Sequence, residues 1–413
     1  MIAEIVLFSL VGLAIGLVAG LTPGIHVNTL IPLILSLSIF IENPYYLATI
    51  IISVAVTEVF LDFIPSIFIG APEADTSLSV LPGHRLLLKG RGYEAIKLTV
   101  IGGLGGLVLT LIFISLFSRG FKILYELTRP YVHFLILFVI IFMVLSERKP
   151  KKMLSALSIM LMSGFLGLIV LNSGLVQQQN ALFPTLTGLF GLSTILLSIH
   201  ERASIPKQEE DEKLLISRKE MIKSLILGCF AGILAGFLPA IGISEAATIV
   251  QYLGGSGDAR SFLITVSSVN AANDAFSLIS LYLVGNPRSG ASVAVQRLFS
   301  SITFYEVLQL VGVILFVAGI ASMLTVYLGR KVPKYLLRIN YRKLCISVSI
   351  FLIMLVFLLT GIYGLLILFV SSSIGILCAK LGIRRSHCMG VLLIPTLLFF
   401  SGLTPFVIRS LGL

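Results

Sequence analysis

Residues 19–30 read AGLTPGIHVNTL and lie inside one of the most apolar parts of the chain. A helix that crosses a bilayer would favour leucine over Thr22, Pro23, His26 and Asn28 here, because proline removes a backbone donor and polar side chains are costly in lipid. A similar stretch, AGFLPAIGISEA, recurs at 235–246. The two stretches predict a pair of broken helices at matching places in a repeated fold.

The composition is that of a polytopic membrane protein. Hydrophobic residues make up 57% of the 413 residues and charged residues 12%, whereas soluble domains carry about 25% charged residues. The net charge of +11 comes from short basic loops between apolar runs, which is a topology signal and does not indicate nucleic-acid binding. We expect the four cysteines to be apolar packing residues without a disulfide or a metal, because none forms a C-x-x-C pair: Cys229, Cys345, Cys378 and Cys388.

Five clear membrane spans are expected in each half of the chain. They run roughly over 44–65, 95–117, 128–146, 153–170 and 181–198, and then over 259–283, 301–328, 344–360, 362–379 and 387–403. Two longer apolar stretches, 2–40 and 220–253, are broken at Pro23-Gly24 and at Pro239, either as re-entrant hairpins or as pairs of short spans. We therefore predict an all-α fold with a first repeat at 1–198, a cytoplasmic linker at 199–219 and a second repeat at 220–413.

Short basic loops orient these spans. The segments 146–152, 329–343 and 380–385 are densely basic and so belong in the cytoplasm. Both termini are then expected outside the cell membrane. Of the 30 Lys and Arg residues, only six would lie on that outer side: Arg119, Lys122, Arg129, Arg288, Arg297 and Arg409.

The two halves resemble each other when the chain is shifted by 216 positions. Gly12, Gly16, Ala19, Gly20, Pro23 and Ile25 then fall on Gly228, Gly232, Ala235, Gly236, Pro239 and Ile241. Span 95–117 starts in the cytoplasm and its counterpart 301–328 starts outside, so the repeats are predicted to be inverted. Inverted repeats with interrupted helices are typical of secondary transporters, and glycines four residues apart permit close helix packing.

The helix breaks are the expected substrate site. Broken helix is tolerated in lipid only where it faces protein or a water-filled cavity, and free N–H groups at a helix start suit an anion. The segments 25–29 and 241–245 would begin the new helices. The expected substrate-binding residues are Thr22, Pro23, Gly24, His26, Asn28, Pro239, Gly242, Ser244, Asn286, Arg288 and Ser289. His26 is either a proton relay or a hydrogen-bonded structural residue.

Acidic and amide side chains within the spans are the candidates for ion coupling. They are Glu58, Asp62, Glu245, Asn270, Asn273 and Asp274. Intramembrane carboxylates usually line an ion or substrate pathway, although ordinary solvated charges at the ends of spans are the alternative. Arg288 and Glu73 occupy equivalent repeat positions, so Arg288 either pairs with Glu73 or binds a substrate carboxylate.

Four stretches resemble the large membrane subunit of the tripartite tricarboxylate transporters. They are GLTPGIH at 20–26, LPGHRLLLKGRGYEAIKLTVIGGLGG at 81–106, NAANDA at 270–275 and VGNPRSGASVAVQRL at 284–298. The second break reads LPAIG where that family has Pro-Gly, and Arg288 stands where it usually has glycine, so the resemblance is to a divergent branch such as the archaeal relatives. It implies a carboxylate substrate, a small membrane subunit and an extracytoplasmic solute-binding protein as partners.

The leading functional prediction is a secondary transporter of an organic anion, plausibly a carboxylate, driven by a proton or sodium gradient. The alternative is a translocator of a lipid-linked phosphate such as polyprenyl phosphate, because phosphate suits helix N-termini equally well. An enzyme is not indicated, since no nucleophile elbow, phosphate loop or metal cluster is present. No cofactor is expected beyond H⁺ or Na⁺ as the coupling ion, and a homodimer is left open.

Overall fold

The described part of the chain forms helices joined by short connections. This computed structural model describes residues 2–22, 27–68, 80–177, 180–200, 206–209, 213–237, 243, 246–247, 249–250, 258–283, 285, 289–299, 302–336 and 341–411. Among these residues, seven helices are long and apolar enough to cross a membrane: Ile2–Leu21, Pro44–Phe68, Gly92–Phe117, Pro150–Asn172, Ala259–Leu283, Phe304–Val332 and Cys345–Lys380. The pair Arg385–Phe400 and Thr404–Ser410, bent by 115°, would make an eighth. The protein is therefore a multi-pass membrane protein.

Most of the expected spans coincide with long helices, although those at 128–146 and 181–198 correspond to the shorter apolar helices His133–Leu145 and Leu182–Leu197. The expected spans 344–360 and 362–379 are two helices that meet at a kink. Residues Tyr341–Lys380 form a single element, α16, that covers both 344–360 and 362–379. It is interrupted at Gly361, where φ is 66° and ψ is −158°. This conformation costs glycine little, which explains why the break falls there. Val356 and Leu368, on either side of Gly361, both belong to the cluster around Leu192.

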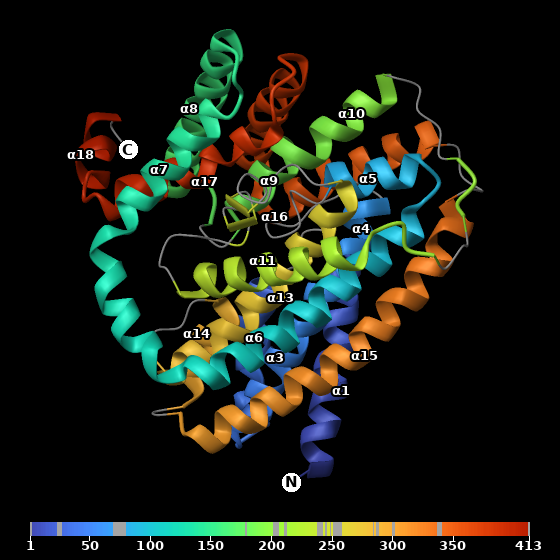
Figure 1. Cartoon of the computed structure of the whole chain (residues 1–413), viewed down its shortest axis with the longest axis vertical. Coiled ribbons are helices and arrows are strands. Elements are labelled where there is room, and N and C mark those ends of the chain that lie inside the picture. Colours follow the sequence, from blue (N-terminus) through green and yellow to red (C-terminus); the bar gives the residue numbers. More distant parts are fainter. Residues whose placement is uncertain are drawn as a thin grey trace.

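The helices pack into two bodies, each built from both halves of the chain (Figure 1). The first body contains α1 (Ile2–Leu21), α2 (Val27–Ser36), η1 (Leu37–Ile39), α3 (Pro44–Leu61), α4 (Phe63–Phe68), α5 (Val80–Leu88), α6 (Gly92–Thr128), α11 (Arg218–Phe237), α13 (Ala259–Leu283), α14 (Gly290–Leu298) and α15 (Phe304–Leu336). The second body contains η3 (Arg129–Tyr131), α7 (Val132–Leu145), α8 (Pro150–Asn172), α9 (Leu182–Leu186), η4 (Thr187–Leu192), α10 (Ser193–His200), α16, η5 (Arg385–Met389), α17 (Gly390–Phe400) and α18 (Thr404–Leu411).

Two glycine-faced helix pairs form the centre of the first body. Gly12, Gly16 and Gly20 of α1 lie against α3, and an added Cβ at Gly16 would come within 2.7 Å of Thr57. Gly228, Gly232 and Gly236 of α11 lie against α13 in the same way. The prediction that these glycines serve close packing is confirmed, because any side chain there would meet backbone or Cβ atoms of the partner helix.

The direction of the helices follows from these contacts. Gly12 lies by Ile50 and Gly20 by Leu61, so α1 runs parallel to α3. By the same reasoning α11 runs parallel to α13, as does α6, whose Gly102 lies by Ile264 and Gly106 by Ser268.

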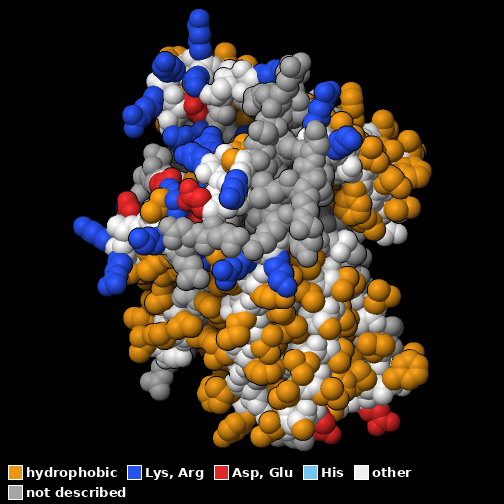
Figure 2. Space-filling model, turned by 90° about the vertical axis from the view of Figure 1, so that its right-hand side faces the viewer, with side chains coloured by type: hydrophobic (Ala, Val, Ile, Leu, Met, Phe, Trp, Pro, Cys, Tyr) orange, Lys and Arg blue, Asp and Glu red, His pale blue; other side chains and the backbone are white. Residues whose placement is uncertain are grey.

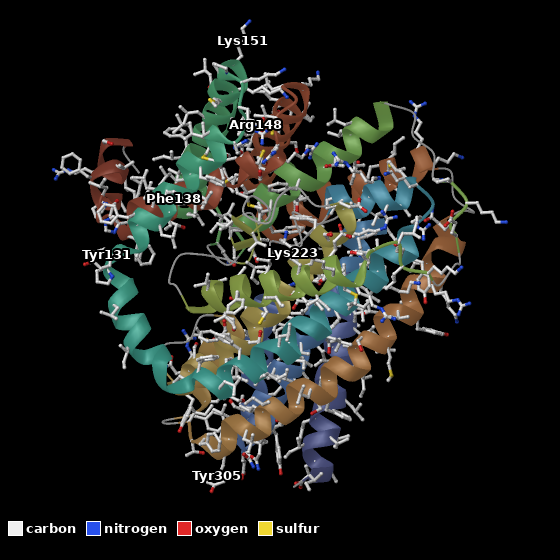
Figure 3. All side chains as sticks on the ribbon, in the orientation of Figure 1. Tyr131, Phe138, Arg148, Lys151, Lys223 and Tyr305 are labelled. Carbon is white, nitrogen blue, oxygen red and sulfur yellow. The ribbon has the colours of Figure 1, made fainter. Side chains whose placement is uncertain are left out.

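Helix α15 runs in the opposite direction to α6, α11 and α13. Gly329 near the end of α15 packs against Ile96 near the start of α6. Figure 3 shows Tyr305, at the start of α15, at the end of the molecule where the N-terminus lies in Figure 1. The start of α15 therefore lies at the same end as the start of α1.

Glycine contacts also recur in the second body. A Cβ on Gly390 of α17 would meet Met160 O and Ser163 Oγ of α8, and a Cβ on Gly188 of η4 would meet Leu368 O and Ser371 Oγ of α16. The partner helix of each pair also contributes a glycine: Gly167 of α8 lies by Val391 O of α17, and Gly375 of α16 lies by Leu189 O of η4. Elements of the first half therefore pack on elements of the second half through equivalent positions.

The surface is divided by chemistry. In Figure 2, hydrophobic side chains cover the lower part of the visible face, Lys and Arg gather above them together with some acidic side chains, and further acidic side chains lie at the lower edge. A broad apolar surface of this kind suits contact with lipid. All four cysteines are free and buried, as their positions in apolar runs predicted.

Candidate functional site

Helix α3 carries the first pair of candidate residues, Glu58 and Asp62, and it is buried along almost its whole length. The two carboxylates lie one helical turn apart, and Asp62 N donates to Glu58 O at 3.0 Å. Only 3% of Glu58 and 4% of Asp62 is exposed. The alternative that these are solvated charges at the end of a span is therefore wrong, because α4 continues the buried run through Phe68.

Glu58 holds the start of the helix that follows the first break. Its Oε2 accepts a hydrogen bond from Val27 N at 2.8 Å, and Val27 is the first residue of α2. The first N–H groups of a helix have no partner within the helix and carry its positive dipole end, so a carboxylate is stabilised there. The Val27 N–H group, which lies in the segment 25–29 expected to bind an anionic solute, is thus bound by a carboxylate of the protein itself.

The approach of α1 leaves little room around this pair. An added Cβ on Gly20 would lie 2.8 Å from Leu61 Cβ and 3.3 Å from Glu58 Cα. Thr22, just beyond, ends α1 with a turn in which its N–H donates to Ala19 O. Helix α1 therefore ends directly beside the turn of α3 that carries both carboxylates.

Helix α13 carries the matching polar stripe in the second half. Both side-chain amide atoms of Asn270 and the hydroxyl of Ser277 are buried and have no hydrogen-bond partner within the described residues. Between them, Asn273 Nδ2 donates to Asp274 Oδ1 at 3.4 Å. Unsatisfied buried polar groups are rare and costly, which marks this stripe as a place where a ligand would find hydrogen bonds.

Asn273 occupies, between α11 and α13, the place that Glu58 occupies between α1 and α3. Gly20 lies by Glu58 and Leu61, and its counterpart Gly236 lies by Asn273 and Phe276. The equivalent position is thus a carboxylate in the first half and a neutral amide in the second.

Ser289 has a structural role at the start of α14. Its hydroxyl accepts from Ser292 N at 3.2 Å, and Ser292 Oγ accepts from Ser289 N at 2.9 Å, which makes a reciprocal capping box. Nine other predicted site residues fall outside the described residues: Pro23, Gly24, His26, Pro239, Gly242, Ser244, Glu245, Asn286 and Arg288. The same holds for Glu73 and for the side chain of Asn28, whose backbone lies in α2.

Sequence reasoning missed an ionic network where α6 and α13 begin. Glu94 is buried at the start of α6, and its Oε1 accepts from Arg260 Nε at 2.9 Å and from Leu215 N at 2.7 Å. Arg91 contacts the same carboxylate and also Glu209 of the linker. Arg91 and Glu94 lie within the stretch 81–106 that resembles the transporter family, but nothing in that stretch indicated Arg260 as their partner.

A second missed feature joins the two halves in the second body. Arg385 is buried and its Nη1 donates to Phe190 O, Ser193 Oγ and Thr194 Oγ1 at 3.2, 2.9 and 2.6 Å. Phe190 lies in η4, which is a π-helix. Such wide turns free a carbonyl from its usual partner, and here a guanidinium takes it.

Glu147, in the loop between α7 and α8, ties that loop to the start of η5. Its Oε1 accepts from Arg384 N at 3.1 Å and lies 3.0 Å from His387 Nε2. Burial favours a raised pKa for Glu147, but the Arg384 N–H and His387 outweigh it and hold the pKa below its usual value. At α5, burial lowers the pKa of His84, so its ring is kept neutral.

Among the described residues, no group of three or more His, Cys, Asp or Glu side chains could hold a metal ion. Glu58 and Asp62 are the buried carboxylates nearest to the first break, and hard cations such as Na⁺ prefer oxygen ligands of this kind.

Comparison with known proteins agrees with this architecture. The family described as "Tripartite tricarboxylate transporter TctA family" matches residues 6–390. The uncharacterized protein MJ1079 of Methanocaldococcus jannaschii is 28% identical over 408 residues, which cover 95% of this chain and 98% of that protein. No solved structure matches the chain. Because the family match extends over nearly the whole sequence, the chain belongs to the tripartite tricarboxylate transporter TctA family.

Proposed function

We propose that this protein is a secondary active transporter that moves an organic anion, a carboxylate, across the cell membrane with a proton or sodium gradient. The observation that carries the proposal is the buried Glu58 carboxylate bound to the first N–H of α2, beside the first break. Buried carboxylates in a membrane span serve coupling far more often than packing. Members of the family are components of tricarboxylate transporters rather than enzymes.

Inverted repeats are part of this proposal. The pairs α1–α3 and α11–α13 use glycines at equivalent positions and run in opposite directions, which supports two inverted copies of one unit. The matching contacts of α8 with α17 and of α16 with η4 support the same arrangement in the second body. Inverted repeats of this kind place the solute between the two copies, where each contributes one broken helix.

The proposed substrate site lies at the two breaks. Its residues are Thr22, Pro23, Gly24, His26, Asn28, Pro239, Gly242, Ser244, Asn286, Arg288 and Ser289. Asp62, Glu245, Asn270, Asn273 and Asp274 join Glu58 as ion-coupling candidates. Helix N-termini attract the carboxylates of the solute, and Asn270 offers a buried amide that has no other partner in the described chain.

The family also supports proposed partners. Tripartite systems imply a small membrane subunit and an extracytoplasmic solute-binding protein, which would deliver the solute from outside. The gathering of Lys and Arg above the apolar surface supports a cytoplasmic position for that end and an extracytoplasmic N-terminus, which lies at the opposite end in Figure 1.

Uptake into proteoliposomes tests the proposal. Radiolabelled citrate, succinate and malate should accumulate when a pH or sodium gradient is imposed, and accumulation should collapse when an ionophore dissipates that gradient. Uptake of none of the three under either gradient would contradict it. Transfer of polyprenyl phosphate between leaflets, without carboxylate uptake, would favour the lipid-phosphate alternative.

A further inference from the structure

Arg385 is a buried charge that the proposed function does not use. It is the first residue of η5, between α16 and α17, and only 9% of it is exposed, whereas the adjacent Arg384 is exposed. Its Nη1 is occupied by the Phe190 carbonyl and by the hydroxyls of Ser193 and Thr194. All three acceptors are neutral, so they satisfy hydrogen bonds without neutralising the guanidinium.

The second body offers this guanidinium no carboxylate. Glu147 is the only acidic residue in 129–200 and 341–413, the two stretches that form the second body. Its Oε1 lies 3.0 Å from His387 Nε2, and no ion pair joins it to Arg385 in the described part of the chain. A buried charge without a counter-charge is costly, and in a membrane protein it usually marks a functional site. A bound anion would supply the missing counter-charge.

The other edge of the guanidinium has the shape that binds an anion. Arginine carries five N–H donors, and those on Nε and Nη2 of Arg385 make no hydrogen bond within the described residues. The exposed part of Arg385 includes this edge, because neither nitrogen is a fully buried atom. Parallel N–H groups on Nε and Nη2 match two oxygens of a carboxylate or of a phosphate.

The neighbouring charges favour an anion at this place. Arg385 ends the basic segment 380–385, and the basic segment 146–152 lies beside it, since Lys152 Nζ donates to Gly382 O at 2.6 Å. The sequence predicts that both segments lie in the cytoplasm. Their positive potential would attract anions from that side of the membrane.

We propose that Arg385 is the centre of a separate anion site at the cytoplasmic end of the second body. It binds a soluble oxyanion, a carboxylate or a phosphate, through Nε and Nη2 while Nη1 holds η4 and α10. This inference goes beyond the proposed function, because the site lies in the body that does not contain Glu58 or Asp62. The bound anion neutralises the guanidinium and so stabilises the junction where η5 of the second half meets η4 and α10 of the first.

Binding of inorganic phosphate to the purified full-length protein tests the site. Titration calorimetry at constant ionic strength, with phosphate in place of chloride, should show saturable binding to the wild type. The Arg385→Gln variant keeps an amide N–H donor but has neither the charge nor the fork. Its phosphate binding should be weaker by about tenfold or more, because the hydrogen bonds lost are made to a charged group. Citrate should displace phosphate from the wild type, since both present a pair of oxygens.

Arg384→Gln is the matched control. It removes the same charge one residue away, but from an exposed side chain, and it keeps the backbone N–H that Glu147 accepts. R384Q should bind phosphate as the wild type does. Citrate uptake into proteoliposomes is measured on the same preparations, because it reports on the proposed function and not on this site.

The outcomes separate this inference from the proposed function. If the wild type binds no phosphate, if R385Q binds it like the wild type, or if R384Q loses as much affinity as R385Q, the inference is wrong even where citrate uptake is normal. If phosphate binding depends on Arg385 but no citrate is taken up, the inference stands and the citrate class of the proposed function is wrong.

Arg385→Lys provides a second arm should R385Q fail to fold. Lysine keeps the charge but has no planar fork. Phosphate binding should again weaken by about tenfold, because the paired hydrogen bonds are lost. Unchanged binding to R385K would overturn the inference.

Discussion

At Gly232 of α11 a single methyl group decides whether two helices can touch. An added Cβ would lie 2.5 Å from both Ala272 Cβ and the Val269 carbonyl oxygen, which cannot move without shifting α13. We expect Gly232→Ala to destabilise the protein by about 1–3 kcal/mol, the usual cost of overpacking. Thermal unfolding in detergent, followed by the loss of the monodisperse peak in size-exclusion chromatography, measures this.

Gly319→Ala is the same chemical change in open surroundings. No atom lies within 4 Å of a Cβ built at Gly319 in α15. Alanine favours helix over glycine by about 0.5–1 kcal/mol, so this variant should be as stable as the wild type or slightly more stable. A Gly232→Ala variant as stable as Gly319→Ala would mean that the contact between α11 and α13 is not tight.

Single residues were predictable from the sequence only where their spacing carried the information. The four-residue period of Gly228, Gly232 and Gly236 was enough to expect close packing, because a helix places such residues on one face. Glu58 could be singled out as a buried acid for the same reason. Its bond to Val27 could not, because it joins two helices across a break whose geometry no local pattern fixes.

The described part of the linker around 206–209 is bound to the first body of helices. Gln208 is buried, and its Oε1 accepts from Gly92 N at 2.9 Å while its Nε2 donates to Leu87 O at 2.9 Å. Gln208→Ala would leave Gly92 N–H without its partner, at a cost of about 1–3 kcal/mol, while Leu87 O would keep its hydrogen bond from Gly90 N. We expect the variant to be cut faster by trypsin after Lys207 and Lys213, as measured by limited proteolysis.

Glu209→Ala is the neighbouring control for the linker. Glu209 pairs with Arg91 at 3.0 Å but is exposed, and exposed ion pairs contribute about 0–1 kcal/mol. Its cleavage rate should stay close to that of the wild type. Equal protection of all three proteins would show that the linker is held by other contacts.

At the scale of elements, hydropathy predicted most of the spans, whereas the contacts of the connections could not be predicted and the breaks at Pro23 and Pro239 lie outside the described residues. The sequence predicted a linker at 199–219 from its polarity alone, and polarity does not reveal that Gln208 completes the start of α6. The break within α16 was better predicted, because the expected spans 344–360 and 362–379 meet at Gly361, where the structure leaves the helical conformation.

The whole molecule combines the two halves in a way that hydropathy does not encode. Helix α6 of the first half packs on α13 of the second, and α15 of the second packs on α3 of the first. These contacts depend on small residues facing each other, such as Gly102 against Ser267, and not on the apolar content of either span. The division into repeats at 1–198 and 220–413 therefore remains a prediction from the sequence. In space, each of the two bodies contains helices from both repeats.

The proposed inverted repeats make the orientation of the whole chain in the membrane testable. Tyr305 and Lys151 are exposed and lie toward opposite ends of the molecule (Figure 3). With both termini outside, Tyr305→Cys should react with a membrane-impermeant maleimide in intact cells, and Lys151→Cys only after permeabilisation. The four native cysteines are buried, so the wild type should give little background labelling. Labelling of the two variants from the same side would contradict the opposed directions of the two halves, because the spans between 151 and 305 would then not return the chain to the outer surface.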